Sequence, residues 1–376
     1  AGLPSENIVY PRVIESRDLN GEKTLHIRPG LVLSLEKSRV FADNFVFSED
    51  DGVNRHDRLM NGKDLEKNLY QDRNHTSVVF VEEEKGTVQR GILDNKFSIE
   101  PIASSRRSED DLVAHTLLDL DDIDNQLGHD SVQDPSLPAQ DVGLSSPEGK
   151  KLRNLPEEFL VEVRIFSDPS FGPNKTMDDF IQYFALVMSR VNQMYKQLSK
   201  PKVQFIVLSI TRLSNYTFTY LVPDRVHDRM NIHLCGTAGS FYQYVSAVYT
   251  KEDQDAYVYV SSLPGGGGCT TGMCKVCSKE PITTQSMGFG QMGGWPPYII
   301  SHELGHLLGM GHEGECPGSY TPGNARLRCR KQEFGYVLGS GKPPHYFSRC
   351  LQDQTRGCLM RKTKQCFALT GNKKLF

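Results

Sequence analysis

The chain has 376 residues, too many for one typical core, and fits two domains of roughly 100 to 200 residues each. Apolar residues make up 38% of it and charged residues 24%, which is typical of globular proteins and too polar for a membrane protein. No apolar run is long enough to cross a bilayer. The formal net charge of −3 gives no global basic field, which excludes nucleic acid as an expected partner.

Cysteine usage divides the chain. All nine cysteines lie between Cys235 and Cys366, and an odd number leaves one thiol over if eight pair. Dense cysteines predict an oxidising, extracellular destination. The chain begins at Ala1 with no initiator methionine or apolar leader, which we interpret as a signal peptide already removed. Three N-x-S/T triplets, the candidate glycosylation sites, support secretion: Asn74, Asn174 and Asn215.

Residues 1–105 alternate short apolar runs with turn-forming residues and predict a small, mostly β domain. Its apolar runs are Leu31–Leu35, Val40–Phe47, Val78–Val81 and Gly91–Ile102. Residues 106–153 are acidic and polar with several prolines, which predicts an exposed linker. Basic residues bracket this linker, Arg106 and Arg107 at its start and Lys150 to Arg153 at its end. Arg153 is the candidate processing site, because a new apolar strand begins soon after it.

Residues 154–376 open with a predicted strand, Phe159–Phe166, followed by a predicted helix, Met177–Leu198, with apolar residues at three- and four-residue spacing. Two further strands are predicted at Val203–Leu213 and Asp255–Leu263. Strand, helix and strand in this order favour a βαβ crossover. We therefore predict an α/β (α+β) domain with a mixed, mostly parallel twisted sheet.

The stretch His302–His312 reads HELGHLLGMGH. Residues four apart lie on one face of a helix, so His302 and His306 can direct imidazole nitrogens at one metal ion. Pro296 and Pro297 supply a start for that helix. The sequence therefore predicts a metal-binding helix.

Three more positions complete the predicted site. Glu303 would lie beside the metal, placed to take a proton from zinc-bound water. Gly309 would end the helix, because glycine adopts the positive φ of a sharp turn at low cost. His312 would then supply a third nitrogen and leave a fourth position for water and substrate.

The stretch His302–His312 resembles the zinc signature of metzincins, and its surroundings resemble the reprolysin (ADAM-like, M12B-type) branch, which includes scorpion-venom (antarease-like) and tick-saliva metalloproteases. The likeness covers about residues 155–359. It is carried by Leu160–Asp168, Val191–Leu198 and Gly335–Ser348, and more loosely, as a pro-segment, by Val9–Arg17 and Gly91–Pro101. The resemblance implies a secreted zymogen whose own pro-segment inhibits it, with the three histidines as zinc ligands and Glu303 as general base.

Near the zinc signature, the sequence departs from the family at two positions. Leu338, in the turn Gly335–Leu338, stands where metzincins have a methionine beneath the zinc. Exchanging Leu for Met conserves volume and costs under about 1.5 kcal/mol, so we expect activity to survive. Met360 is a rival candidate for that methionine but falls late in the chain. Glu313 follows the third histidine, where reprolysins usually carry aspartate, which alters the surroundings of the ligands.

Latency and calcium are further implications of the resemblance. Family pro-segments often silence the zinc with a cysteine thiolate, which this chain lacks before residue 235. We hypothesise that the acidic segment Glu109–Asp124, or His115, crosses the cleft instead. Some reprolysins also hold a structural calcium ion. Glu162 and Asp255 match two of its ligands, while Arg361 occupies the place of the asparagine that completes them.

The remaining cysteine and histidine signals are weaker. Cys269, Cys274 and Cys277 end in a Cys-x-x-Cys pattern that suits half a zinc finger, a redox pair or disulfides. Disulfides are favoured in a secreted chain, where they would staple the loop Gly265–Gly268 and the chain entering the zinc helix. His233 and His345 lack ligand spacing to another donor and are predicted to be surface or packing residues. The glycine-rich loop lacks the lysine that a P-loop requires.

We expect a monomeric enzyme whose substrate is an extended extracellular polypeptide. It would pair with an edge strand near Gly265–Met292 or Asp255–Leu263. The alternative is a catalytically silent binding protein or toxin on the same scaffold. Intact Glu303 and three intact histidines argue against it, and we expect no adhesion module after Cys366, where ten residues remain.

Overall fold

The computed structural model describes residues 8–15, 23–72, 76–82, 85–94, 96–102, 112–119, 154–248, 255–289, 295–312, 338 and 347–368. Several sequence predictions fall outside these ranges: Asn74, Arg106, Arg107, residues 109–111 and 120–124 of the acidic segment, Arg153, Glu313, Gly335–Val337 and His345. Among the described residues, no helix is long and apolar enough to cross a membrane.

The N-terminal region forms a nine-stranded sheet in which every neighbouring pair is antiparallel. In spatial order its strands are β1 (Ile8–Val9), β11 (His115–Asp119), β10 (Phe97–Pro101), β9 (Thr87–Leu93), β8 (Val78–Glu82), β7 (Leu69–Asp72), β4 (Leu31–Lys37), β3 (Lys23–Arg28) and β2 (Arg12–Glu15). The strands predicted at Leu31–Leu35 and Val78–Val81 are confirmed as β4 and β8. The Gly91–Ile102 run is instead divided between β9 and β10 by a turn.

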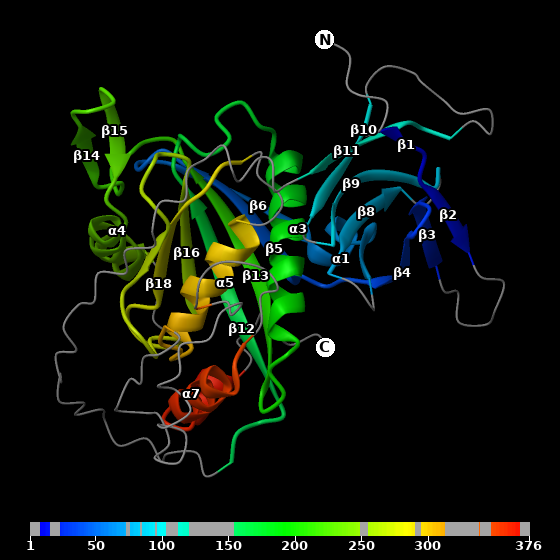
Figure 1. Cartoon of the computed structure of the whole chain (residues 1–376). Coiled ribbons are helices and arrows are strands. Elements are labelled where there is room, and N and C mark those ends of the chain that lie inside the picture. Colours follow the sequence, from blue (N-terminus) through cyan, green and yellow to red (C-terminus); the bar gives the residue numbers. More distant parts are fainter. Residues whose placement is uncertain are drawn as a thin grey trace.

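The second sheet has seven strands and mixed pairing (Figure 1). Its order is β17 (Gly268–Thr270), β18 (Ile282–Ser286), β16 (Ala256–Ser261), β12 (Glu158–Ser167), β13 (Lys202–Leu213), β5 (Phe41–Asp50) and β6 (Arg55–Asn61). The four inner pairings are parallel, and the outermost pairing at each edge is antiparallel. The predicted βαβ crossover is confirmed, because β12 and β13 are parallel neighbours joined through α3 (Met177–Tyr195).

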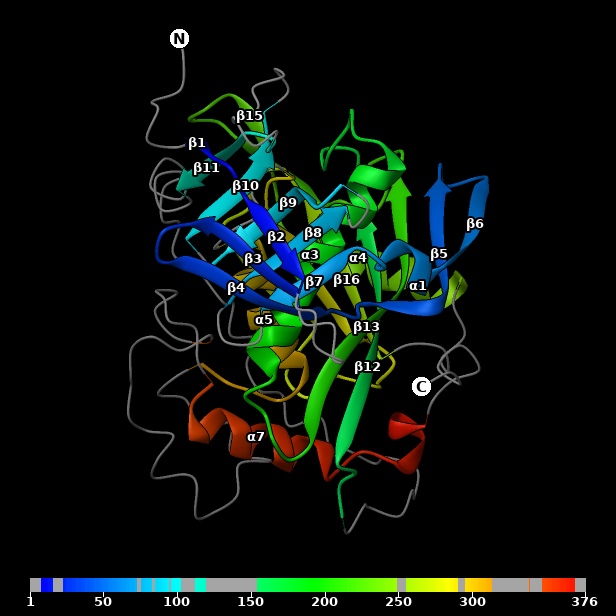
Figure 2. The same ribbon diagram turned by 90° about the vertical axis from the view of Figure 1, so that its right-hand side faces the viewer.

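Strands β5 and β6 belong to this second sheet although they fall within residues 1–105 (Figure 2). The hairpin lies between β4 and β7 in sequence, yet β5 pairs in parallel with β13, more than 150 residues later. Residues 1–105 therefore do not fold as a single self-contained sheet. The apolar pattern of Val40–Phe47 correctly predicted a strand, but it carried no information about the partner.

Helix α3 stands between the two sheets (Figure 1) and begins at a capping box formed by Thr176 and Asp179. Its buried residues join the largest hydrophobic cluster, which also contains side chains from both sheets and from α5 (Trp295–Leu307). The other described elements are α1 (Gly62–Leu65), the hairpin β14 (Leu221–Asp224) and β15 (Arg229–Ile232), α4 (Leu234–Val248), α7 (Arg349–Leu359) and the 3-10 helix η2 (Lys364–Phe367).

Candidate metal centre

Helix α5 carries the predicted ligands and ends as its sequence requires. Pro296 and Pro297 lie in its first turn, where a missing N–H costs nothing. After Leu308 the chain turns at Gly309, whose φ is +92°. Gly309 N donates to His306 O at 2.8 Å, and the N–H of Met310 donates to the carbonyl of Gly305 at 3.0 Å. This pair of bonds is a Schellman motif, so the predicted sharp exit at Gly309 is present.

The turn at Gly309 brings three imidazole rings together. Ring nitrogens of His302, His306 and His312 all lie within 4.8 Å of one another. Nε2 of His302 and Nε2 of His306 face each other at 3.1 Å. The ring centroid of His312 is 5.3 Å from that of His302 and 4.9 Å from that of His306. The side chains of His302 and His306 are buried, and that of His312 is partly buried.

These donors fit zinc. Two nitrogens bound tetrahedrally at the usual Zn–N length would be separated by about 3.3 Å, close to the 3.1 Å between the two Nε2 atoms. His306 Nδ1 lies 2.7 Å from the carbonyl oxygen of Met310, which can only accept, so Nδ1 carries the proton. The lone pair of His306 Nε2 is then directed at the shared centre. Three neutral imidazoles are a donor set that zinc and other borderline divalent metals prefer.

Glu303 lies on the same helix, buried beneath strand β17. A Cβ atom added at Gly268 would lie 2.4 Å from Glu303 Oε1 and 2.5 Å from Glu303 Cγ. Glycine at 268 therefore allows the backbone of β17 to pass directly against the carboxylate. The negative charge of Glu303 also reaches Tyr298, whose pKa is raised by burial first and by that charge second.

The underside of α5 rests on α3 and on Leu338. Tyr195 Oη donates to the carbonyl of Ser301 at 2.8 Å, and burial raises the pKa of this tyrosine well above its ordinary value. Leu338 is fully buried, and its Cδ1 would lie 3.1 Å from a Cβ added at Gly305. Leu338 thus packs against the metal-site helix, at the level between the first and last ligands of that helix.

The loop that carries His312 is held by a residue that the sequence did not reveal. Gln354, buried on α7, accepts a hydrogen bond from Gly311 N at 2.8 Å. The Cys-x-x-Cys segment binds the end of α5 as well, because Cys274 N donates to His306 O and Val276 N donates to Leu307 O. These bonds satisfy carbonyls that a helix end leaves open.

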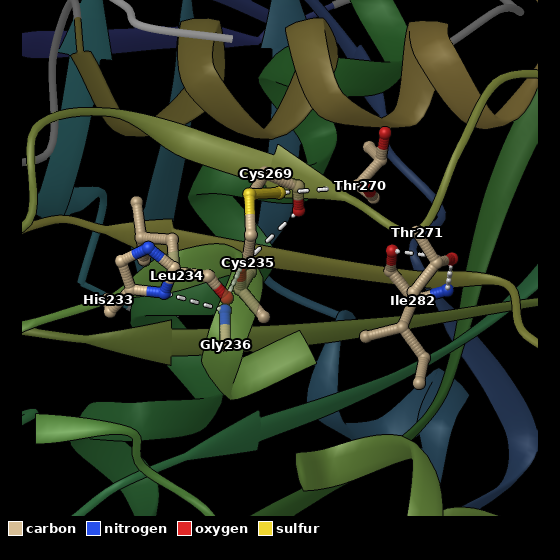
Figure 3. The surroundings of a disulfide bond; sticks show 9 residues. His233, Leu234, Cys235, Gly236, Cys269, Thr270, Thr271 and Ile282 are labelled. Carbon is tan, nitrogen blue, oxygen red and sulfur yellow. Dashed lines mark hydrogen bonds between the residues drawn. A yellow bond between two sulfur atoms is a disulfide. The ribbon is translucent and has the colours of Figure 1, made fainter. Parts of the chain in front are cut away.

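The favoured disulfide interpretation of the cysteines is confirmed. Cys274 pairs with Cys358 and Cys277 pairs with Cys366, so the Cys-x-x-Cys pattern is neither a finger nor a redox pair. Both bonds tie the segment that contacts the end of α5 to the C-terminal helices α7 and η2. The third bond, Cys235–Cys269, joins the first turn of α4 to β17 (Figure 3). Cys350 is also disulfide-bonded.

Two histidines singled out by the sequence lie away from the centre. His115 is buried in β11, with its ring nitrogens 2.9 Å from the carbonyl of Val113 and 2.6 Å from that of Val88. The hypothesis that His115 reaches the metal is therefore wrong, because both of its ring nitrogens contact backbone carbonyls within the N-terminal region. His233 accepts a hydrogen bond from Gly236 N at the start of α4 (Figure 3), which is a capping role.

The other predicted residues are placed as follows. Glu162 and Asp255 are buried neighbours on β12 and before β16, joined by Glu162 N to Asp255 Oδ2 at 2.9 Å and Asp255 N to Glu162 O at 3.0 Å. Asn174 is exposed ahead of α3. Asn215 is partly buried, and its Nδ2 donates to the carbonyl of Asp51 at 2.6 Å.

Sequence reasoning missed Gly268 and Gln354 as parts of the site. Gly268 ends a four-glycine run, which marked a loop but not its approach to Glu303. Gln354 lies in a polar segment with no motif, so no local signal could have found it.

Comparison with known proteins finds similarity to metallopeptidases. Residues 181–313 match the metallo-peptidase family M12B, reprolysin-like. The chain is 24% identical to the venom metalloproteinase BumaMPs1 of Olivierus martensii over 96% of its length and 92% of that protein. It is 21% identical to the antarease-like venom metalloproteinase TtrivMP_A of Tityus trivittatus, over 80% of each chain. A crystal structure of metalloproteinase-II from Bacteroides fragilis aligns over 89% of both chains with a TM-score of 0.41 and 9% identity.

Proposed function

We propose that this chain, a zinc metalloendopeptidase carrying a reprolysin-like M12B domain, is a secreted zymogen in which His302, His306 and His312 hold the zinc and Glu303 is the general base. The observation that carries the proposal is the convergence of three imidazole nitrogens within 4.8 Å, with Glu303 on the same helix.

Zinc, when bound, supplies Lewis-acid chemistry that lowers the pKa of water and polarises a peptide carbonyl. Glu303 takes the proton from the attacking water and later delivers it to the leaving amine nitrogen. Its burial under β17 keeps bulk water from the carboxylate, which strengthens its electrostatic interactions. Tyr195 and Gln354 act through the ligands, by holding α5 and the loop before His312.

The substrate would be an extended extracellular polypeptide that pairs with the outer side of β17. Within the described residues no strand pairs with that side, and Gly268 brings the strand to Glu303. A peptide added there would pass beside the general base, as β-strand addition requires. The Cys235–Cys269 disulfide would keep this short strand in place.

Residues 1–105, with β11 (His115–Asp119) added to their sheet, are proposed as the pro-domain, the rest of 106–153 as the processed linker with Arg153 at the cut, and 154–376 as the catalytic domain. Three described disulfides support an oxidising compartment, and exposed Asn174 suits glycosylation. Residues 109–111 and 120–124 of the acidic segment Glu109–Asp124 remain the proposed inhibitor, because its centre, His115–Asp119, is strand β11 of the nine-stranded sheet. A peptide of that segment that fails to inhibit the processed enzyme would contradict this.

A structural calcium ion at Glu162 and Asp255 is a separate proposal. It rests on the adjacency of two buried acidic residues. Calcium added to chelator-treated protein should raise the unfolding temperature without changing the rate of hydrolysis. An unchanged unfolding temperature would leave the two residues as a purely structural pair.

The decisive test is hydrolysis of a quenched protein substrate by the full chain cut within residues 120–153. We expect activity that a zinc chelator abolishes and zinc restores. Glu303→Gln should retain bound zinc but lose activity by roughly 10²- to 10⁴-fold. His233→Ala, at an exposed histidine outside the site, is the matched control and should be fully active. Undiminished hydrolysis by Glu303→Gln would rule out this mechanism, and an inactive but zinc-loaded native protein would favour a binding role.

A further inference from the structure

The N-terminal region supplies a strand to the catalytic sheet. Strand β5 runs parallel to β13, with Val46 opposite Ser209 and Phe47 opposite Ile210. At one end of the pairing the N–H of Val207 donates to the carbonyl of Val40 at 2.7 Å. Because β13 is twelve residues long, this pairing covers a long edge of the sheet that would otherwise have exposed backbone groups.

The side chains of β5 complete the catalytic core. Phe41, Phe45 and Phe47 are each at most 2% exposed. They belong to one continuous cluster with the residues of α3 and α5, and the ring of Phe47 meets that of Phe180 edge to face at 6.4 Å. The region before the linker and the region after it therefore share one hydrophobic core.

Polar contacts also join the N-terminal region to the elements that follow the linker. At the tip of the β5–β6 hairpin, Tyr244 Oη donates to the carboxylate of Asp50, and Ser214 N donates to the carbonyl of Asp50 at 2.9 Å. On α3, Gln193 Nε2 donates to the carbonyl of Ser77, immediately before β8 of the nine-stranded sheet, at 3.0 Å. The contacts thus extend from β13 across α3 to the nine-stranded sheet.

We propose that the edge of β13 is a strand-docking surface whose occupant is β5, so that the N-terminal region stays bound as a non-covalent subunit after the linker is cut. Dissociation would expose three buried phenylalanines and leave the side of β13 that faces away from β12 without a partner, which is unfavourable in water. Only the cut itself is taken from the proposed function; the association does not depend on proteolytic activity.

The N-terminal region can stay bound through β5 without covering β17. Strands β18, β16, β12 and β13 separate β17 from β5 in the sheet. At the usual spacing between strands, the two lie about 24 Å apart. The docked strand therefore lies far from the strand that passes over Glu303. Cutting the linker would release an inhibitory segment while β5 remains in place.

The test uses the full chain with a recognition sequence for a site-specific protease inserted within residues 120–153. After complete cutting, we expect both fragments to elute together at the size of the intact protein, at nanomolar concentration, and to separate only in denaturant. Amide hydrogens of Val207 and Ser214, which bond to Val40 and Asp50, should stay as protected from exchange as before the cut. Fragments that separate in native buffer would overturn the proposal.

Matched variants locate the docking surface. Phe47→Ala, at a side chain 2% exposed, should weaken association of the cut fragments at least tenfold, whereas Leu59→Ala, 71% exposed on β6, should not change it. Equal weakening by both would overturn the assignment to β5. If Phe47→Ala does not fold before cutting, Tyr244→Phe replaces it. This change removes one hydrogen bond to Asp50 and should weaken association of the cut fragments several-fold. An unchanged affinity would count against docking through β5.

Discussion

The two edges of the seven-stranded sheet are treated in opposite ways. At one edge β17 has three residues, is anchored by Cys235–Cys269, and passes over Glu303 at a glycine. Toward the other edge, the N-terminal region adds β5 and then β6, so that β6 forms the edge and the twelve-residue β13 is covered. A short, anchored edge can stay available to a substrate, whereas a long apolar edge has to be covered.

This difference assigns separate tasks to the two ends of the sheet. On the proposed function, chemistry takes place where α5 meets β17, whereas much of the buried core lies where α3 and β13 meet β5. Substitutions at the β17 edge should therefore change turnover, and substitutions at the β13 edge should change folding.

Removing the N-terminal region should have the largest effect. Burying one phenylalanine contributes roughly 1.5 to 3 kcal/mol, so losing the three of β5 would remove roughly 5 to 9 kcal/mol, comparable to a whole domain's stability. We expect residues 154–376 expressed alone to aggregate or to unfold without cooperativity, as measured by size-exclusion chromatography and thermal denaturation. A monomeric fragment that unfolds cooperatively would show that β5 is dispensable.

At the β17 edge, Gly268→Ala should lower kcat by roughly 10²-fold, because the added methyl group displaces the Glu303 carboxylate from its position. Zinc content and unfolding temperature should change little. Gly239→Ala on α4, where a Cβ meets no atom within 4 Å, is the matched control and should keep full activity. An active Gly268→Ala enzyme would show that the contact is not a constraint.

Replacing both Cys235 and Cys269 by alanine should lower the free energy of unfolding by about 3 to 4 kcal/mol, because the disulfide closes a loop between cysteines that are 34 residues apart. Urea unfolding of the full chain would measure this cost. Because the bond anchors β17, kcat should also fall, by less than in Gly268→Ala. An unchanged unfolding midpoint would mean that neighbouring contacts alone hold the strand.

The smallest effect is expected away from both edges. Leu338→Met should cost under about 1.5 kcal/mol and leave hydrolysis unchanged, because it restores a side chain of similar volume beneath Gly305. Leu338→Ala should cost roughly 2 to 5 kcal/mol, because the site is fully buried. Equal stability of the two variants in urea unfolding would show that Leu338 does not support α5.

Local pattern was enough to predict the metal-site helix and its exit. Four-residue spacing places His302 and His306 on one face, and Gly309 alone permits the turn that brings His312 back. The βαβ crossover of β12, α3 and β13 also followed from periodicity, because each element is long and regular. These features depend on residues close in sequence.

Tertiary structure alone decided what β5, Gly268 and Gln354 do. An apolar run specifies a strand but not its partner, and β5 pairs across more than 150 residues. The roles of Gly268 and Gln354 likewise arise from contacts with Glu303 and Gly311, which lie 35 and 43 residues away. Such contacts form because burial and hydrogen bonding are satisfied over the whole core at once, which no local window of sequence records.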